Sequence, residues 1–353
     1  MEKHRKIIIF NLIILISFGV VFIVWTKWKA NVNNKHKSTY DLKEWAYYNC
    51  GQPIKGNIGV KGVDINIKNV NKLIGEDTKE VLVAIVDTGI YFDTTNDKGY
   101  WRNSREIKND GIDNDGNGYI DDCNGWDFYN DDESIYDNYL YDYHGTYIAN
   151  TIQSISLTSK LIPCKFLSGT IGDTKDAVKA IKYAIDNGAT IINCSWNFEN
   201  KDEELYKLMK NNSDVLFVCA AGNSNLNLDE NNLYPVSYKL NNVISVMSIN
   251  NEGIMYEYSG YGKSVDIAAP GKDVYVAIPE KDKTYVDGTS VSAAFVTGTA
   301  ALMKSIAPNI EPVEIKSIIV ESAHRTDTLS GKCGAEGYLD VYNSVKCVKN
   351  RWR

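Results

Sequence analysis

Three side chains of this sequence have the chemistry of a nucleophile, a base and an acid, and the first is Ser290. It follows Gly288-Thr289 and precedes small and apolar residues that can form a buried helix. At a helix N-terminus, unpaired backbone N–H groups and the helix dipole favour developing negative charge, so a serine there can act as a nucleophile. A serine before an apolar run is more commonly a plain N-cap, and Ser290 taken alone fits both roles.

His144 is the candidate base. The sequence has four histidines, of which two flank an apolar N-terminal run and one, His324, lies near a predicted helix end. His144 lies in Asp142-Tyr-His-Gly-Thr, where a loop joins a helix-like stretch. Imidazole titrates near neutral pH, which suits it to proton transfer. A lone histidine is usually structural, but His144 is the one histidine of the four placed to act as a general base.

Asp87 is the candidate acid, and it ends the apolar run that begins at Val81. A run that is apolar at every position predicts a central parallel strand with both faces buried. The carboxylate then falls at the carboxyl end of a strand, where α/β sheets place their functional sites. The alternative is that Asp87 only caps the turn that follows.

Strands and helices alternate after residue 161, and this alternation predicts the scaffold for these three residues. Apolar runs predict strands, and apolar residues at helical spacing predict helices. The predicted strands are residues 161–167, 190–195, 215–221 and 243–249, and the predicted helices are residues 173–188 and 203–211. Alternating strands and helices indicate a parallel sheet covered by helices.

The three motifs stand in the order Asp87 in Val-Asp-Thr-Gly, His144 in His-Gly-Thr and Ser290 in Gly-Thr-Ser. On these residues the chain resembles the subtilisin-like serine protease (subtilase) family over roughly residues 44–346. Further matches are Trp45, Gly51-Gln52, Ala220-Ala-Gly-Asn223, Tyr234-Pro235 and Ala268-Ala-Pro-Gly271. The resemblance implies an α/β, subtilisin-like three-layer fold with a mostly parallel central sheet covered by helices on both faces. It also implies a serine endopeptidase that acts through an acyl-enzyme.

The resemblance assigns a role to each site residue. His144 would take the proton of Ser290, and Asp87 would orient the imidazole and stabilise the imidazolium. Asn223 would donate to the oxyanion together with the N–H of Ser290. The rival hypothesis is a catalytically silent subtilase scaffold that binds or regulates a partner.

The resemblance also implies where a peptide substrate lies. Ser195, Trp196 and Asn197 would pair with its backbone, and Ala220, Ala221 and Gly222 would line the first specificity pocket. Ordinary packing at two strand ends is the alternative for all six residues. Asn197 stands where many members of the family have glycine, so its side chain could narrow the cleft.

Residues 110–142 hold eleven acidic residues and no lysine or arginine. Part of this segment matches the first half of a calcium-binding loop, with oxygen ligands at alternate positions and glycine at the sixth, although the closing glutamate is absent. The candidate ligands are Asp113, Asp115, Asn117, Tyr119 and Asp121. A solvated acidic turn is the alternative. No cofactor is expected for the chemistry itself, and Ca²⁺ is considered only as a structural ion.

Residues 7–25 form an apolar run that spans about 28 Å as a helix, close to the hydrocarbon thickness of a bilayer. We expect a short basic segment at 1–6, a transmembrane signal anchor at 7–25, a juxtamembrane linker at 26–40 and a peptidase domain at 41–349. The flanking lysines and arginines are nearly balanced, so the positive-inside rule leaves the orientation open. The run predicts a single-pass cell-membrane protein, with a cleaved signal peptide as the alternative, and the resemblance favours an extracytoplasmic catalytic domain.

Charge and cysteine content exclude other classes. The formal net charge is −7, which argues against a general nucleic-acid-binding protein. The seven cysteines show no C-x-x-C spacing, which argues against a zinc site. The expected partners are a peptide or protein substrate and the membrane. Family members often carry an inhibitory prosegment, and here either none is needed or a short one lies within residues 26–43.

Overall fold

The computed structural model describes residues 41–75, 78–91, 99–279 and 281–352, and those from Leu42 onward form one compact unit. The expected anchor at 7–25 and linker at 26–40 lie outside the described residues. Within the described ranges, no helix combines the length and apolar character needed to cross a membrane. The transmembrane helix therefore stays a prediction.

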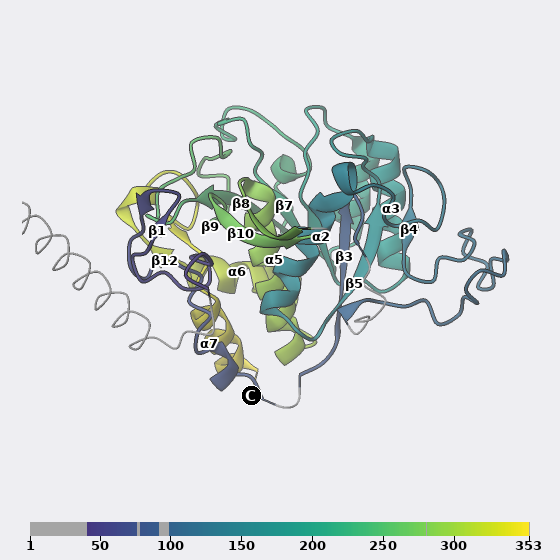
Figure 1. The fold of residues 1–353 in the computed structure, drawn as a ribbon, viewed down its shortest axis with the longest axis horizontal. Coiled ribbons are helices and arrows are strands. Elements are labelled where there is room, and N and C mark those ends of the chain that lie inside the picture. The colour runs from purple at the N-terminus through teal and green to yellow at the C-terminus, as the bar shows by residue number, and fades with distance from the viewer. Residues whose placement is uncertain (1–40, 76–77, 92–98, 280, 353) are drawn as a thin grey trace, which may run out of the picture. The chain divides into compact units, whose positions relative to one another are not determined.

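A sheet of nine strands, counted over the described residues, forms the centre of the fold (Figure 1). Its order is β12-β13-β9-β8-β7-β6-β3-β5-β4. The strands are β3 (Val81–Asp87), β4 (Trp126–Asp127), β5 (Ser159–Lys165), β6 (Ile191–Cys194), β7 (Leu216–Ala220), β8 (Val243–Ile249), β9 (Ile267–Pro270), β12 (His324–Arg325) and β13 (Gly337–Tyr338). All neighbours in the sheet are parallel except β12 and β13. The predicted α/β class with a mostly parallel sheet is confirmed.

The order of the strands assigns helices to both faces. β3 pairs with β5 on one side and β6 on the other, so the chain reverses direction across the sheet after β5. The step from β3 to β5 contains α2 (Tyr139–Ile155) and the step back from β5 to β6 contains α3 (Thr174–Asp186), so right-handed connections for these two opposite steps place the two helices on opposite faces. One face carries α2 packed against α5 (Thr289–Ile306), and the other carries α3 packed against α4 (Glu203–Asn211).

Helix α5 runs through the core, beside α2 in Figure 1. Almost every one of its side chains is buried, as expected for a helix that is apolar or small all round. α6 (Pro312–Glu321) and α7 (Val341–Arg351) pack against it. The N-cap of α5 is Gly288, which places Ser290 in the first turn. Ser290 is therefore not the N-cap that its sequence context also allowed.

The smaller elements complete the compact unit. They are β1 (Pro53–Ile54) with β2 (Asn57–Ile58), the hairpin of β10 (Val274–Ile278) and β11 (Lys281–Val286), and the 3-10 turns η1 (Val70–Lys72), η3 (Val236–Tyr238) and η4 (Asp327–Leu329). Trp45, which is fully buried, donates from Nε1 to Asp273 O at 2.8 Å and ties the start of the unit to β10. All seven cysteines lie in the described ranges and none forms a disulfide.

Candidate active site

Asp87 and His144 form a hydrogen-bonded pair at the carboxyl edge of the sheet. Asp87 is the last residue of β3 and is completely buried, whereas the His144 side chain is 27% exposed. His144 Nδ1 lies 2.6 Å from Asp87 Oδ1, which also accepts the N–H of Thr88 at 2.7 Å. This geometry fixes the imidazole and leaves its Nε2 for other partners.

Gly145 lets α2 approach the end of β3 closely enough for this pair to form. A Cβ at position 145 would lie 2.2 Å from the carbonyl oxygen of Gly89. The Thr88 hydroxyl joins the same two elements, since it accepts from Gly145 N at 3.0 Å and donates to Asp142 O at 3.1 Å. The glycine and the histidine of the His-Gly-Thr motif thus serve the same contact.

Ser290 lies in the first turn of α5 and is 8% exposed. Its Oγ donates to Ser195 O at 3.1 Å, and Ser195 Oγ donates to Ser290 O at 3.1 Å. Among the described residues, no hydrogen bond joins Ser290 to His144 in this conformer. Ser195 and His144 line the same cavity, so the hydrogen bonds between Ser195 and Ser290 place Ser290 at the edge of the sheet where His144 lies.

Asn223 is held with its amide N–H groups available. Its Oδ1 accepts the N–H of Thr289 at 2.9 Å and the hydroxyl of Thr289 at 3.1 Å. Because a carbonyl oxygen accepts these bonds, the amide orientation is fixed and Nδ2 remains as a donor. The residue is exposed and belongs to the segment after β7. The anchor at Thr289, a residue that the sequence analysis assigned no role, places this donor beside Ser290.

A cavity of about 570 Å³ lies next to His144. Four parts of the chain line it: Thr88 after β3, helix α2 with Leu140, Tyr141, Tyr143 and His144, residues 167–171 after β5 and residues 195–198 after β6. Ser195, Trp196 and Asn197, which the resemblance assigns to substrate binding, are in its lining. Ala220, Ala221 and Gly222 are not in that lining and are buried instead.

Two walls of this cavity were not predicted from the sequence. Leu140 and Tyr141, 65% and 53% exposed, line it because α2 begins at Tyr139, before the histidine. Gly169 N donates to Tyr141 O at 3.1 Å and joins the two walls. The predicted parallel sheet was the signal that could have found the wall formed by residues 167–171. The loop after β5 leaves the sheet next to the end of β3 because neighbouring parallel strands end at the same edge.

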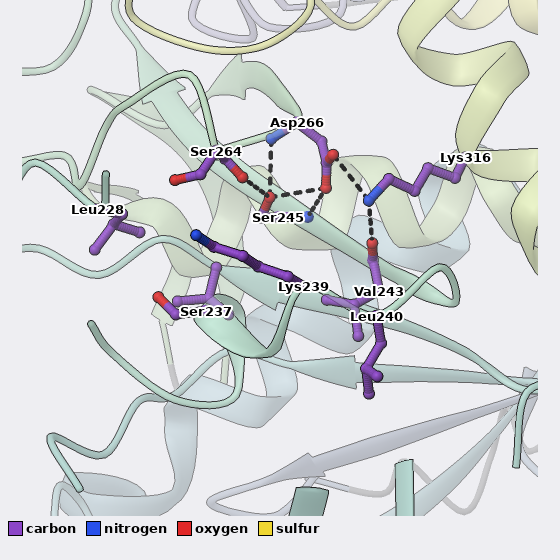
Figure 2. Close-up of a pocket in the computed structure, with 10 residues that line it drawn as sticks. Leu228, Ser237, Lys239, Leu240, Val243, Ser245, Ser264, Asp266 and Lys316 are labelled. Carbon is purple, nitrogen blue, oxygen red and sulfur yellow. Dashed lines mark hydrogen bonds and ion pairs between the residues drawn. The ribbon is translucent and has the colours of Figure 1, made fainter. Parts of the chain in front are cut away.

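A second cavity, of about 30 Å³, has room for roughly one water molecule. Residues of η3, β8 and α6 are among those that line it. Figure 2 shows Lys316 reaching from α6 to Asp266 at 2.9 Å and to Val243 O at 2.7 Å. These contacts fasten α6 to the sheet. None of the candidate catalytic residues lines this cavity, so the larger one is the candidate substrate cleft.

A buried lysine lies next to the acid of the pair. Lys165 pairs in register with Asp87 across β5 and β3 and is 1% exposed. Its Nζ contacts Asp127 at 2.5 Å and Asp137 at 2.7 Å. Burial alone would lower the pKa of Lys165, but the hydrogen bonds to the two carboxylates outweigh it and raise that pKa. Two acids of the 110–142 segment, Asp127 and Asp137, thus pair with a buried lysine of the sheet.

The candidate calcium ligands are only partly brought together. Carboxylate oxygens of Asp113, Asp115 and Glu106 lie within 4.8 Å of one another. Glu106 precedes the loop and was missed by the sequence analysis. Asn117 instead donates to Asp122 at 3.0 Å, and Asp121 accepts from the backbone of Asp110 and Gly111. The ring of Tyr119 packs on Trp126, Phe128 and Tyr183.

The hydrogen bond from Gly118 N is the largest influence on Asp113 and lowers its pKa. Asp113 is therefore ionised at neutral pH beside the two other carboxylates. One cation, Arg105, pairs with Asp115 at 2.9 Å. These oxygens are the donor type that Ca²⁺ prefers, and such an ion would relieve the repulsion between the carboxylates.

Comparison with known proteins assigns the class. Residues 78–337 match the model of the Subtilase family, a range that holds Asp87, His144, Asn223 and Ser290. The chain therefore belongs to the subtilase family.

Two curated relatives illustrate the sequence likeness. The chain is 29% identical over 313 residues to a cell wall-associated protease of Bacillus subtilis (strain 168), and this match covers 85% of the chain and 31% of that protein. It is 25% identical over 352 residues to subtilisin-like protease 1 of Plasmodium berghei (strain Anka), covering 89% of the chain and 57% of that protein. The chain thus spans between about a third and just over half of these relatives.

Solved structures show the same fold. A protease from Pseudoalteromonas arctica PAMC 21717 aligns with a TM-score of 0.63 at 24% identity, covering 87% of this chain and 97% of that one. The A-subunit of the AB5 toxin from E. coli aligns with a TM-score of 0.63 at 21% identity, covering 81% and 98%. The subtilisin-like α/β fold predicted from the motifs is confirmed.

Proposed function

We propose that this chain is a serine endopeptidase that hydrolyses peptide bonds through an acyl-enzyme. One observation carries the proposal: Asp87 and His144 pair at 2.6 Å, and Ser195, which lines the cavity with His144, and the amide of Asn223 both contact the first turn of α5, where Ser290 lies. Membership of the subtilase family supports it. The adjacent cavity of about 570 Å³ provides room for an extended peptide.

Each residue has a defined part in the proposed reaction. Ser290 Oγ attacks the scissile carbonyl while His144 Nε2 takes its proton, and Asp87 stabilises the imidazolium that forms. The oxyanion accepts the N–H of Ser290 and an N–H of Asn223 Nδ2, and α5 adds the positive end of its dipole. His144 then returns the proton to the leaving amine, and water hydrolyses the acyl-enzyme by the same steps.

The proposed setting is a membrane surface. The apolar run at 7–25 supports an anchor, and an anchored protease suits limited processing of protein or peptide substrates better than bulk digestion. We place the catalytic unit outside the cytoplasm. Digestion of the folded domain by an added protease on intact cells, compared with lysed cells, tests that placement, because only an extracytoplasmic domain is accessible before lysis.

A silent scaffold is the competing function, and Ser290 reactivity separates the two. The full-length protein in detergent is treated with a fluorophosphonate serine probe beside the Ser290→Ala variant. We expect labelling of the wild type that the variant loses. A folded wild-type protein that the probe does not label, with and without Ca²⁺, contradicts the endopeptidase proposal and favours the scaffold.

A structural Ca²⁺ at the Glu106, Asp113 and Asp115 cluster is a further part of the proposal. Three carboxylates converge there within 4.8 Å, and this supports a hard cation. The ion would stabilise the loop and takes no part in the chemistry.

A further inference from the structure

Asn197 fills the gap between the segments that follow β6 and β7. Its Nδ2 donates to Ala220 O at 2.9 Å. Its Oδ1 lies 3.2 Å from the position that a Cβ on Gly222 would take. The two strands are parallel neighbours in the sheet, so their following segments leave it side by side. The Asn197 side chain therefore reaches across from one segment to the backbone of the other.

This gap opens beside the nucleophile. Ser195, on one segment, exchanges two hydrogen bonds with Ser290, and Gly222 N, on the other, donates to Thr289 Oγ1 at 3.1 Å. A carbonyl attacked by Ser290 has its oxygen toward the donors of Ser290 and Asn223, at the mouth of the gap. If the side chain of the residue that supplies this carbonyl enters the gap between the two segments, it meets the Asn197 side chain, which occupies that space.

The residues that line the cavity agree with an Asn197 side chain that fills the gap between the two segments. The cavity of about 570 Å³ includes Asn197 in its lining but none of Ala220, Ala221 and Gly222. Displacing the Asn197 amide would take its hydrogen bond from the buried Ala220 carbonyl. A large substrate side chain would also overpack the space between the two backbones. Small side chains avoid both penalties.

We propose that Asn197 determines the primary specificity of this chain by closing its first pocket. The enzyme cleaves after glycine, alanine or serine and excludes large residues such as phenylalanine, leucine and lysine. This inference rests on the proposed endopeptidase function and names the substrate class at the same site.

The test uses the full-length protein in detergent and measures how fast Ser290 is phosphonylated. Two peptidyl diphenyl phosphonates differ only in the side chain next to phosphorus, methyl as in alanine or benzyl as in phenylalanine. Ser290 Oγ bonds to phosphorus, a phenoxide leaves, and His144 takes the serine proton. We expect the wild type to react at least about 100-fold faster with the alanine probe.

Two variants separate the effect of side-chain volume at position 197 from the effect of its polar atoms. Asn197→Gly removes the Asn197 side chain from the gap and leaves Leu233, whose Cδ1 lies 2.6 Å from the Cβ position of Gly222. This variant is expected to reduce the alanine-to-phenylalanine rate ratio at least about tenfold. Asn197→Leu keeps a branched side chain of similar shape without the polar atoms and is expected to keep the preference for alanine. Asn197→Ser replaces the glycine variant if that variant does not fold, as judged by circular dichroism.

Equal rates of the wild type with both probes would overturn the proposal. So would an unchanged rate ratio in a folded Asn197→Gly protein. A small alkyl fluorophosphonate, which carries no substrate side chain, reports the reactivity of Ser290 separately. A folded wild type that reacts with no probe overturns the endopeptidase function and this inference with it. Reaction with the fluorophosphonate and equal reaction with both phosphonates overturns only the role of Asn197.

Discussion

Ser195 and Ser290 exchange two hydrogen bonds, each 3.1 Å long, between the end of β6 and the first turn of α5. Ser195 Oγ also accepts from Asn193 Nδ2 at 2.8 Å, and Asn193 Oδ1 accepts from Thr297 at 2.9 Å. A buried polar network thus fixes Ser290, the proposed nucleophile, to the end of β6. Networks of this kind hold a site rigid when every member is satisfied.

The Ser195→Ala variant tests this network. It leaves the buried Asn193 Nδ2 without an acceptor, so we expect the free energy of unfolding to fall by about 1–3 kcal/mol. Urea unfolding measures the change. Ser330→Ala, on an exposed turn, is the matched control and is expected to change the free energy by less than about 0.5 kcal/mol. Equal effects of the two substitutions would contradict a structural role for the Ser195 hydroxyl.

The Asp87→Asn variant tests the orientation of the histidine. An amide in place of the carboxylate can donate to Nδ1, which favours the wrong imidazole tautomer, so kcat is expected to fall about 10⁴-fold near neutral pH. Peptide hydrolysis at pH 7 measures the change. Unaltered labelling by a fluorophosphonate would show that the 2.6 Å contact between His144 and Asp87 does not activate Ser290.

The Asn223→Asp variant tests the oxyanion donor. A carboxylate keeps the acceptor that holds the Thr289 N–H but has no N–H for the oxyanion. We expect kcat to fall at least about 10²–10³-fold while KM changes little, because the lost bond forms in the transition state. Steady-state kinetics separates the two constants. A rise in KM with kcat intact would mean that Asn223 binds substrate instead.

The Lys165→Met variant tests the buried cation beside Asp87. Without the lysine, the completely buried Asp127 keeps an uncompensated charge, and such losses cost about 3–5 kcal/mol of stability. Chemical denaturation measures the cost. The double variant Lys165→Met with Asp127→Asn removes both charges, so it is expected to be more stable than the single Lys165→Met variant. A double variant that is less stable would contradict the charge argument.

The same cluster predicts a pH dependence. Burial acts to raise the pKa of Asp137, but the hydrogen bonds from Lys165 and Ser134 outweigh it and leave that pKa lowered. Stability from Asp137 is therefore present above the ordinary value of 3.8 and is lost as pH falls further. The pKa of Lys165 is raised, so its contribution is present below 10.5 and is lost as pH rises beyond it. The Tm values of the wild type and the Lys165→Met variant, measured by thermal unfolding, should become similar at both extremes of pH. They should differ most between these extremes.

Calcium addition tests the acidic cluster. We expect Ca²⁺ to raise the Tm of the wild type by a few degrees and EDTA to reverse it, because a ligand that binds only the folded state stabilises it. Asp113→Asn removes one carboxylate of the cluster, and its Tm is expected to respond much less. Asp131→Asn, an exposed acid outside the cluster, is the control. Equal responses of all three proteins would show that the ion binds elsewhere or weakly.

Local signals in the sequence were enough for the main elements. α4 and β8 occupy the predicted residues 203–211 and 243–249 because their apolar spacing matches one secondary structure clearly. Asp87, His144 and Ser290 were proposed as site residues because each lies in a short motif next to an apolar run. The short strands β4, β12 and β13 have only two residues each and carry no periodicity that could predict them.

The sequence by itself determined which side chains are available and the order in which the chain presents them. Only the tertiary structure decided which of them meet. The partners Ser195 and Ser290 lie 95 residues apart, and Asn197 and Ala220 lie 23 apart. Such contacts depend on which strands become neighbours and how their ends are spaced, and residue periodicity contains neither. The contact between Asn197 and Ala220 therefore follows only from the pairing of β6 with β7.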